Sequence, residues 1–327
     1  MSPSFSATAP AKINLTLEVL GKRPDGCHEI VSILQTIDLC DTLTVESSSH
    51  LRLAAPGLDC DESDNLVLKA AQLLRDATSC SLGAEILLEK RIPSSAGLGG
   101  GSSDAATALV ALNQLWELGL GSEALADLAA RLGSDVPFFF LGGATSLARG
   151  RGELLEPLPP LADLWVVLTV PPVIIPHKTK ALYAALTPAD FSDGSASLHL
   201  AQQLRAGDRL PFQALRNVFE RPAFALYPLI ASYREAMLAA GAPFVRLSGS
   251  GPALFTLYHA RRDARALVHR LAGEGMPAHL TSLGHDAHPG SDSQAGGCET
   301  NARDQKRRTG RRAPAQQSAA LLSETPA

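Results

Sequence analysis

The chain has 327 residues, of which 45% are hydrophobic and 19% charged, so it can bury a sizeable core and is neither wholly disordered nor collagen-like. Its 29 basic and 33 acidic side chains leave a formal net charge of −4, and only 5% of residues are aromatic, which disfavours nucleic acid as the main partner. The five cysteines are widely spaced without a CxxC pair, so neither a disulfide framework nor a zinc site is indicated.

The N-terminal part is predicted to be rich in strands, because residues 12–19 alternate apolar and polar side chains as a half-buried strand does. A turn at residues 23–26 leads into a second β-prone stretch over residues 30–45. The elements expected next are a helix capped by Asp64 and ending near Asp76, a strand over 84–89, a glycine-rich loop over 93–103, a helix through about Trp116, a helix over 122–132, and a β-like core over 136–140.

The segment Glu156-Pro157-Leu158-Pro159-Pro160 is stiff and poor in backbone donors, so we expect a domain boundary there. The elements predicted beyond it are a strand over 164–170, helices near 178–186 and 222–240, two strands around a glycine turn within 245–257, a helix over 262–271 and a strand ending near 283. Glycine, serine, glutamine and charged residues dominate after Leu283, as in a disordered tail. The predicted division is an N-terminal domain over 1–158, a C-terminal domain over 159–283 and a tail over 284–327.

The sequence favours a protein of the cytoplasm. The first positive side chain is Lys12, so the N-terminus lacks the basic region of a signal peptide. No apolar run reaches the roughly 18 residues that a membrane span needs. We therefore expect no membrane partner, and either a monomer or a homodimer.

The most informative segment is the loop Pro93-Ser94-Ser95-Ala96-Gly97-Leu98-Gly99-Gly100-Gly101-Ser102-Ser103. Its glycines let backbone N–H groups approach a ligand closely, and it runs directly into a predicted helix, whose N-terminus favours phosphate oxygens. A Walker A motif is excluded because the loop holds no lysine, and a Rossmann fingerprint because its third glycine position falls on Ser102. The loop therefore predicts a nucleotide-phosphate site, where Ser102 and Ser103 could bond a phosphate or Mg²⁺.

Three motifs resemble those of the GHMP kinases, in the same order and with similar spacing over about residues 8–283. The glycine-rich loop is similar to their phosphate-binding motif, Ala9-Pro10-Ala11-Lys12-Ile13-Asn14-Leu15 to their N-terminal motif, and Leu247-Ser248-Gly249-Ser250-Gly251-Pro252 to their C-terminal glycine turn. Within these kinases, the segments 23–29, 133–139 and 148–153 resemble those of the branch that acts on 4-diphosphocytidyl-2-C-methyl-D-erythritol.

The resemblance implies an α+β GHMP kinase fold with two α/β-sandwich-type domains and the active site in the cleft between them. It also implies ATP-dependent phosphorylation of the 2-hydroxyl of that alcohol, in the non-mevalonate route to isoprenoid precursors, with ATP as co-substrate and Mg²⁺ bridging its phosphates. The ATP-binding residues it implies are Pro93, Ser94, Ser95, Ala96, Gly97, Leu98, Gly99, Gly100, Gly101, Ser102, Ser103, Gly249, Ser250 and Gly251.

The same resemblance assigns the catalytic roles to Lys12 and Asp135. Asp135 would accept the proton of the hydroxyl group, and Lys12 would stabilise the charge that develops on its oxygen. From the residues alone, Asp135 would as readily be a turn or helix cap and Lys12 a solvated side chain of an alternating strand.

Asn14, Cys27 and His28 are expected to contact the alcohol substrate. His28 offers a donor and an acceptor for a base edge, and Asn14, on the same strand face as Lys12, could bond the methylerythritol hydroxyls or hold Lys12 in place. The resembled family usually has Tyr at position 27, stacked on cytosine, whereas this chain has Cys27. A second family aromatic, expected after the strand near Val170, is not evident in residues 171–176. Two alternatives therefore stay open: a GHMP kinase for another small alcohol, and a non-catalytic ligand sensor of the same fold.

Overall fold

Two long antiparallel strands, β1 (Ser4–Lys22) and β2 (His28–Ser48), organise the structure, a computed structural model that describes residues 3–57, 64–141, 144–161 and 163–284. The predicted turn at residues 23–26 joins them, and Gly26 there has a φ of 85°, which glycine adopts without strain. Both predicted strands are confirmed, and both extend beyond their predicted ends.

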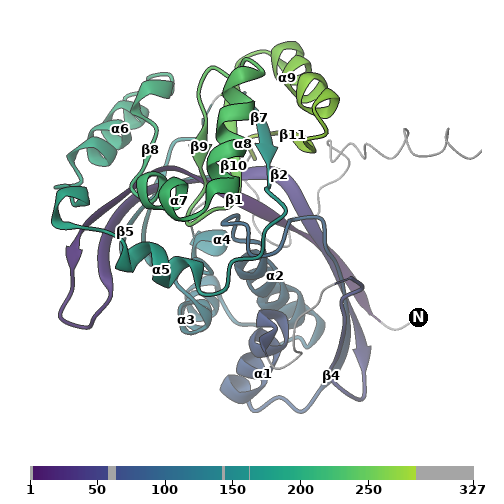
Figure 1. Cartoon of the computed structure of the whole chain (residues 1–327). Helices are drawn as coiled ribbons and strands as arrows, with labels where there is room; N and C mark the ends of the chain where they lie inside the picture. The colour runs from purple at the N-terminus through teal and green to yellow at the C-terminus, as the bar shows by residue number, and fades with distance from the viewer. Residues whose placement is uncertain (1–2, 58–63, 142–143, 162, 285–327) are drawn as a thin grey trace, which may run out of the picture. The chain divides into compact units, whose positions relative to one another are not determined.

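A seven-stranded sheet forms around this pair, in the order β3-β4-β2-β1-β8, with β5 paired to β2 and β6 paired to β5. Its other strands are β3 (Arg52–Ala54), β4 (Gly83–Glu89), β5 (Thr145–Gly150), β6 (Leu154–Leu158) and β8 (Arg216–Asn217). Strand β2 is long enough to pair with β5 over residues 30–35 and with β4 over residues 42–48. The helices α1 (Leu66–Thr78), α2 (Gly100–Leu115) and α3 (Ser122–Leu132) lie together, with α2 against β1 and β2 (Figure 1).

A second sheet has four antiparallel strands in the order β11-β7-β10-β9. These strands are β7 (Trp165–Thr169), β9 (Arg246–Leu247), β10 (Leu254–Tyr258) and β11 (Ala278–Ser282). Helix α9 (Arg261–Gly273) packs on it, and α7 (Glu220–Leu226) contacts α8 (Pro228–Ala239). Between β7 and β8 the chain forms α5 (Lys178–Ala184), α6 (Ser195–Arg205) and the 3₁₀ turns Pro188–Asp190 and Phe212–Ala214. The architecture is α+β, as predicted.

A hydrophobic core shared by the two sheets lies next to the glycine-rich loop. Ile13 and Leu15 of β1 meet Val166 of β7 and Phe255 of β10 in this core. The side chains of Ile92, Ala96 and Leu98 join the same core and are at most 2% exposed. Buried apolar side chains on both sides of the glycines therefore anchor the loop, which leaves its backbone as the part that can meet a ligand.

The expected boundary after residue 158 falls in the connection between β6 and β7, where the chain passes from one sheet to the other. Strand β8 later returns to the larger sheet by pairing in parallel with β1 at residues 16–17. The described residues cluster as one compact unit, and the division into domains over 1–158 and 159–283 stays a prediction. The predicted tail, apart from Gly284, lies outside the described residues.

The predicted β-like core over residues 136–140 is wrong, because residues 138–141 form the short helix α4 (Phe138–Leu141). Its three phenylalanine side chains are at most 9% exposed and all join the core beside α1, α2 and α3. A strand would point alternate side chains to opposite faces, whereas one helical turn lets all three rings reach the same core.

Three helix predictions also need correction. The helix predicted over 222–240 is divided into α7 and α8 at Tyr227, because Pro228 disfavours a helical conformation in the residue before it. Helix α1 is capped by Asn65, whose Oδ1 accepts a hydrogen bond from Val67 N at 2.9 Å, and not by Asp64. Helix α6 was not predicted, although four of its residues are buried at helical spacing.

Candidate functional site

A cavity of about 990 Å³ opens between β1, the glycine-rich loop, α5 and the turn before β10. The residues predicted from widely separated motifs meet in its wall: Lys12, Asn14, Cys27, His28, Gly97, Gly99, Asp135, Gly249 and Ser250. All five residues predicted as catalytic or alcohol-binding are in this set. The fold thus brings together residues that are more than two hundred positions apart in the sequence.

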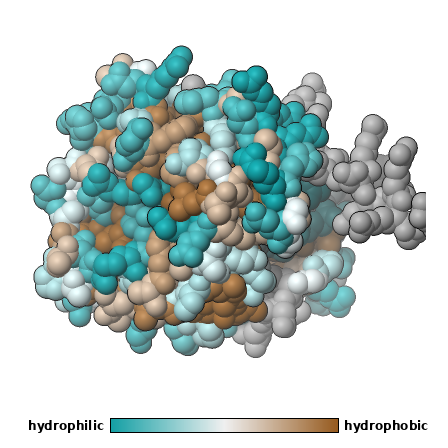
Figure 2. Space-filling model, turned by 45° about the horizontal axis from the view of Figure 1, so that its top comes forward, coloured by the Kyte–Doolittle hydropathy of each residue, from teal (hydrophilic) through white to brown (hydrophobic). Residues whose placement is uncertain are grey.

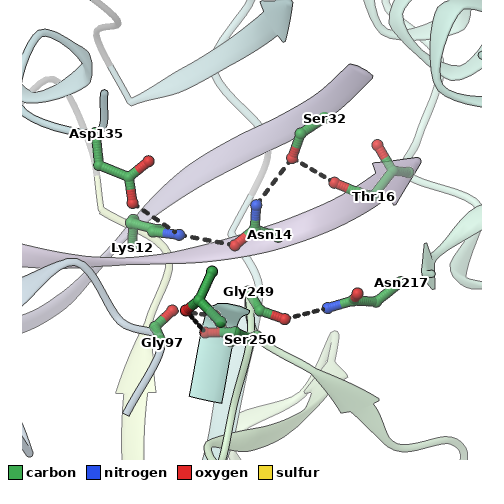
Figure 3. A network of polar contacts seen from close by, with 11 residues as sticks. Lys12, Asn14, Thr16, Ser32, Gly97, Asp135, Asn217, Gly249 and Ser250 are labelled. Carbon is green, nitrogen blue, oxygen red and sulfur yellow. Dashed lines mark hydrogen bonds and ion pairs between the residues drawn. The ribbon is translucent and has the colours of Figure 1, made fainter. Parts of the chain in front are cut away.

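Lys12 and Asp135 lie side by side in the wall of this cavity (Figure 3). Lys12 Nζ lies 3.4 Å from Asp135 Oδ2 and donates a hydrogen bond of 2.8 Å to Asn14 Oδ1. The lysine side chain is 6% exposed, whereas that of Asp135 is 41% exposed. The ammonium group is therefore held in place from within the protein, while the carboxylate remains accessible to a ligand.

The polar face of β1 is buried, contrary to the expectation of a half-buried strand with a solvated face. Asn14 Nδ2 donates to Ser32 Oγ at 2.9 Å, and Ser32 Oγ donates to the carbonyl oxygen of Thr16 at 2.5 Å (Figure 3). Counted over the whole residue, backbone included, Lys12 and Asn14 are 4% and 5% exposed. This row of hydrogen bonds fixes the rotamer of Asn14, and Asn14 in turn orients the ammonium group of Lys12.

The glycine-rich loop needs glycine at two positions. Gly97 and Gly99 have φ values of 82° and 70°, in the left-handed region that disfavours other residues. A Cβ atom at position 97 would lie 2.2 Å from the carbonyl oxygen of Ser248, and one at position 99 would lie 2.9 Å from Lys12 Cγ. The loop can therefore touch both the C-terminal glycine turn and Lys12 only because these side chains are missing.

The predicted ATP-binding residues divide into three groups. Backbone at Gly97, Gly99, Gly249 and Ser250 lines the cavity. Gly100, Gly101, Ser102 and Ser103 form the first turn of α2, which therefore begins within the segment predicted as loop. The other predicted residues, Pro93, Ser94, Ser95, Ala96, Leu98 and Gly251, are not in the cavity wall, and Ala96 and Leu98 have buried side chains.

Two side chains hold the C-terminal glycine turn in place beside the loop. One comes from the turn itself and the other from β8. Ser248 Oγ donates to the carbonyl oxygen of Gly97 at 3.0 Å. Asn217 Nδ2 donates to the carbonyl oxygen of Gly249 at 2.8 Å (Figure 3). It also donates to the carbonyl oxygen of Leu247 at 2.8 Å. Asn217 was not singled out from the sequence, and only the pairing of β8 with β1 places it beside the turn.

A second ionic cluster, consisting of Asp41, Lys90 and Asp104, lies where the loop and α2 meet the sheet. Lys90 Nζ contacts Asp41 Oδ2 and lies 2.7 Å from Asp104 Oδ2, while Asp41 Oδ1 accepts from Ile92 N at 2.8 Å. Burial lowers the pKa of Lys90, but the two carboxylates outweigh it and raise the pKa overall. Burial raises the pKa of Asp104 to about 7 against the opposing charge of Lys90. We call these three residues the buried cluster.

The two serines at the start of α2 differ in their suitability for Mg²⁺. The side chain of Ser103 is fully buried beneath the loop, and its Oγ has no hydrogen-bond partner among the described residues. Ser102 is only partly buried. Within the part of the chain that the structure describes, no group of three or more His, Cys, Asp or Glu side chains could hold a metal ion. Of the two serine hydroxyls, that of Ser102 is therefore the more accessible to a ligand.

The other end of the cavity is aromatic. His28 stacks on Tyr183 of α5, with ring centroids 4.4 Å apart and planes inclined by 16°, and Phe191 approaches His28 edge-on at 6.3 Å. Burial, assisted by the charge of Lys22, lowers the pKa of His28, so its ring is neutral at pH 7. Burial raises the pKa of Tyr183 to about 12. A neutral imidazole and a neutral phenol ring thus face the same space.

Tyr183 is an aromatic residue of the cavity wall that the sequence analysis did not single out. It lines the cavity together with Cys27 and His28, although it lies in α5 and well beyond the strand where an aromatic residue was expected. The sequence signal was present, because Tyr183 is among the few aromatic residues of the chain. Its distance from β7 concealed it, since residues 170–177 form a connection without helix or strand before α5 begins.

Among the residues that the structure describes, no helix is long and apolar enough to cross a membrane. On the face seen in Figure 2, hydrophobic and hydrophilic residues alternate in small patches.

Comparisons with known proteins identify relatives over most of the chain. Residues 65–143 match the family described as GHMP kinases N terminal domain, and residues 200–277 match GHMP kinases C terminal. A 4-diphosphocytidyl-2-C-methyl-D-erythritol kinase of Dehalococcoides mccartyi is 42% identical over 275 residues, which cover 84% of this chain and 96% of the relative. The kinase of the same name from Pelotomaculum thermopropionicum is 44% identical over 270 residues, covering 81% of this chain and 93% of the relative.

Solved structures agree with this result. A crystal structure of 4-(cytidine 5'-diphospho)-2C-methyl-D-erythritol kinase superposes with a TM-score of 0.71 at 39% identity, covering 86% of this chain and 99% of the other. Homoserine kinase from Cytophaga hutchinsonii superposes with a TM-score of 0.67 at 19% identity, covering 88% of this chain and 97% of the other, which supports the fold alone. The expected GHMP kinase fold is thereby confirmed.

Proposed function

The chain belongs to the 4-diphosphocytidyl-2-C-methyl-D-erythritol kinases of the GHMP superfamily, and from this premise we propose that it transfers the γ-phosphoryl group of ATP to the 2-hydroxyl of that alcohol. The product would serve the non-mevalonate route to isoprenoid precursors. The observation that carries the proposal is the approach of Lys12 Nζ to Asp135 Oδ2, 3.4 Å apart, in a cavity bounded by two glycine-rich segments.

In the proposed reaction, the 2-hydroxyl oxygen bonds to the γ-phosphorus while the bond from that phosphorus to the β–γ bridging oxygen breaks, and ADP leaves. Asp135 accepts the hydroxyl proton, for which its half-exposed carboxylate is accessible. Lys12 stabilises negative charge on the attacking oxygen and on the γ-phosphoryl group. Asn14 holds the ammonium group in position through its 2.8 Å hydrogen bond.

We propose that the backbone of residues 93–103 and of Gly249, Ser250 and Gly251 surrounds the phosphates of ATP. Support comes from the open backbone at Gly97 and Gly99 and from the N-terminus of α2, since both present N–H groups to an anion. Mg²⁺ would neutralise part of the phosphate charge when bound, and Ser102 is the side chain that we assign to its neighbourhood.

We propose that the cytidyl end of the alcohol occupies the aromatic end of the cavity. His28, being neutral, can both donate to and accept from a base edge, and Asn14 faces the end where the alcohol hydroxyls would lie. Tyr183 supplies a ring for stacking where Cys27 cannot. Recognition in this chain would therefore depend on one aromatic face in place of two.

The test is an ADP-release assay on the purified protein with a panel of acceptor alcohols. The proposal predicts turnover with 4-diphosphocytidyl-2-C-methyl-D-erythritol and far less with alcohols that lack the base. Turnover of a base-free alcohol alone would favour the other GHMP kinase activity, which the absence of Tyr at position 27 keeps open. ATP binding without turnover of any alcohol would favour the ligand sensor. The cytoplasmic location and the choice between monomer and homodimer stay predictions.

A further inference from the structure

Lys178, the first residue of α5, lies at a junction that the phosphoryl-transfer mechanism does not use. The residue is 8% exposed. Its Nζ donates a hydrogen bond of 2.7 Å to the carbonyl oxygen of Ser95 in the glycine-rich loop and another to the carbonyl oxygen of Gly251 in the C-terminal turn. One side chain therefore connects three segments of the cavity wall.

The position of Lys178 is unfavourable for a helix. A positive charge at a helix N-terminus meets the positive end of the helix dipole, and burial penalises the charged form. Burial lowers the pKa of Lys178 to about 8, and its ammonium group donates to two neutral carbonyl oxygens. Among the residues that the structure describes, no carboxylate pairs with Lys178, so the two carbonyl groups must account for its burial.

Both carbonyl groups belong to backbone in the left-handed region. Ser95 has a φ of 53°, which is uncommon for a residue with a side chain, and Gly251 has a φ of 71°. His177, which precedes the lysine, also has a positive φ of 50°. Such conformations persist only where surrounding contacts determine them, and Lys178 makes contacts of this kind to Ser95 and Gly251.

The two segments that Lys178 joins also touch each other directly. Ala253 N donates to the carbonyl oxygen of Ala96 at 3.0 Å, in addition to the bond from Ser248 to Gly97. Because a peptide group is planar, a Ser95 carbonyl that points to Lys178 directs the N–H of Ala96 to the opposite side. The lysine thus sets the orientation of a peptide group at the start of the loop.

We propose that Lys178 is a positioning residue for nucleotide binding, which orients the backbone of the glycine-rich loop and fixes it to the C-terminal glycine turn and to α5. The inference rests on the proposed function in one respect, namely that the glycine-rich loop binds ATP. Helix α5 also carries Thr179, whose Oγ1 lies 2.8 Å from Ser250 Oγ, and it carries Tyr183. The contacts of Lys178 therefore link the phosphate end of the cavity to its aromatic end.

The experiment measures the Kd of Mg²⁺-ATP by calorimetry for wild type, Lys178→Met and Lys178→Arg. Loss of two hydrogen bonds from a charged donor should weaken binding about tenfold or more in Lys178→Met, while Lys178→Arg should retain most of the affinity. Lys69→Met removes an exposed lysine of α1 and should leave the Kd unchanged. A Kd in Lys178→Met within twofold of wild type would overturn the proposal.

The pH dependence of the same Kd provides a test if Lys178→Met does not fold. The loop over 93–103 and the turn over 247–252 contain no titratable side chain, so the groups that titrate nearby are His177 and Lys180 of α5 and the cavity pair Lys12 and Asp135. Wild type should lose affinity above about pH 8, where Lys178 releases its proton, and Lys178→Arg should not. Identical pH profiles for the two proteins would contradict the proposal.

These measurements are independent of the acceptor alcohol. If no alcohol in the panel is phosphorylated but Mg²⁺-ATP binds with the predicted dependence on Lys178, the proposed activity fails and the role of Lys178 stands. If the cytidyl alcohol is phosphorylated and Lys178→Met binds ATP normally, the activity stands and the role of Lys178 fails.

Discussion

Lys12 and Lys90 are both largely shielded from solvent and paired with carboxylates, but their surroundings differ. Lys12 has one carboxylate partner, Asp135, which is 41% exposed and faces a cavity. Lys90 lies between Asp41 and Asp104, whose side chains are 0% and 4% exposed. The carboxylate beside Lys12 keeps room for a substrate, whereas Asp41 already accepts from a lysine and from backbone N–H groups. In the proposed mechanism the first pair serves chemistry, whereas the contacts of the second favour a role in supporting the loop.

The largest expected effect concerns Asp135→Asn. Removing the proton acceptor should lower kcat by about 10²–10⁴-fold, while the free energy of unfolding should change little because the side chain is half exposed. ADP release and a melting curve measure the two quantities. Asp127→Asn, an exposed change on α3, is the control. Turnover of Asp135→Asn near that of wild type would remove Asp135 from the mechanism.

Asp41→Ala should show the opposite pattern, with its main effect on stability. The change leaves Lys90 with one carboxylate and frees the backbone N–H of Ile92, at a cost of about 3 kcal/mol in the free energy of unfolding. Urea unfolding measures the loss, and Glu46→Ala, an exposed change on the same strand, is the control. A loss no greater than that of the control would show that the buried cluster does not support the fold.

The buried cluster should also make stability depend on pH. Burial raises the pKa of Asp104 from 3.8 to about 7, so between these values the folded state binds more protons than the unfolded state. This group therefore favours folding at acidic pH, and its contribution falls as pH rises from about 4 to about 7. Asp104→Asn should flatten this part of the curve of unfolding free energy against pH. If the curve of Asp104→Asn keeps the slope of wild type, the pH dependence of stability comes from other groups.

The smallest expected effect concerns position 27 in the cavity wall, where this chain has cysteine. Cys27→Tyr should add a second aromatic face beside the base and lower KM for the cytidyl alcohol about fivefold, which corresponds to about 1 kcal/mol of stacking. KM for ATP should stay the same, because the glycine-rich loop is a separate segment. Cys27→Ser adds no ring and is the control. An unchanged KM in a folded Cys27→Tyr variant would mean that the base does not lie beside position 27.

Several features could be predicted from the sequence because they depend on neighbouring residues. The run from Gly97 to Gly101 predicts a loop that enters a helix, since glycine tolerates the positive φ found at two of its positions. The boundaries of α3 agree with the prediction because its apolar residues recur at helical spacing and Gly133 ends the helix. Lys12, Asp135, Asn14, Cys27 and His28 were found through motifs, and all of them line one cavity.

Other features were decided by packing between distant segments. The polar face of β1 is buried because the glycine-rich loop, the C-terminal turn and β2 cover it, and no periodicity within residues 12–19 contains that information. Tyr183 lines the aromatic end of the cavity because α5 starts where Lys178 joins two loops from other parts of the chain. Local sequence determines backbone preference over a few residues, whereas burial, charge pairing and the cavity itself arise only when segments far apart in the chain exclude water together.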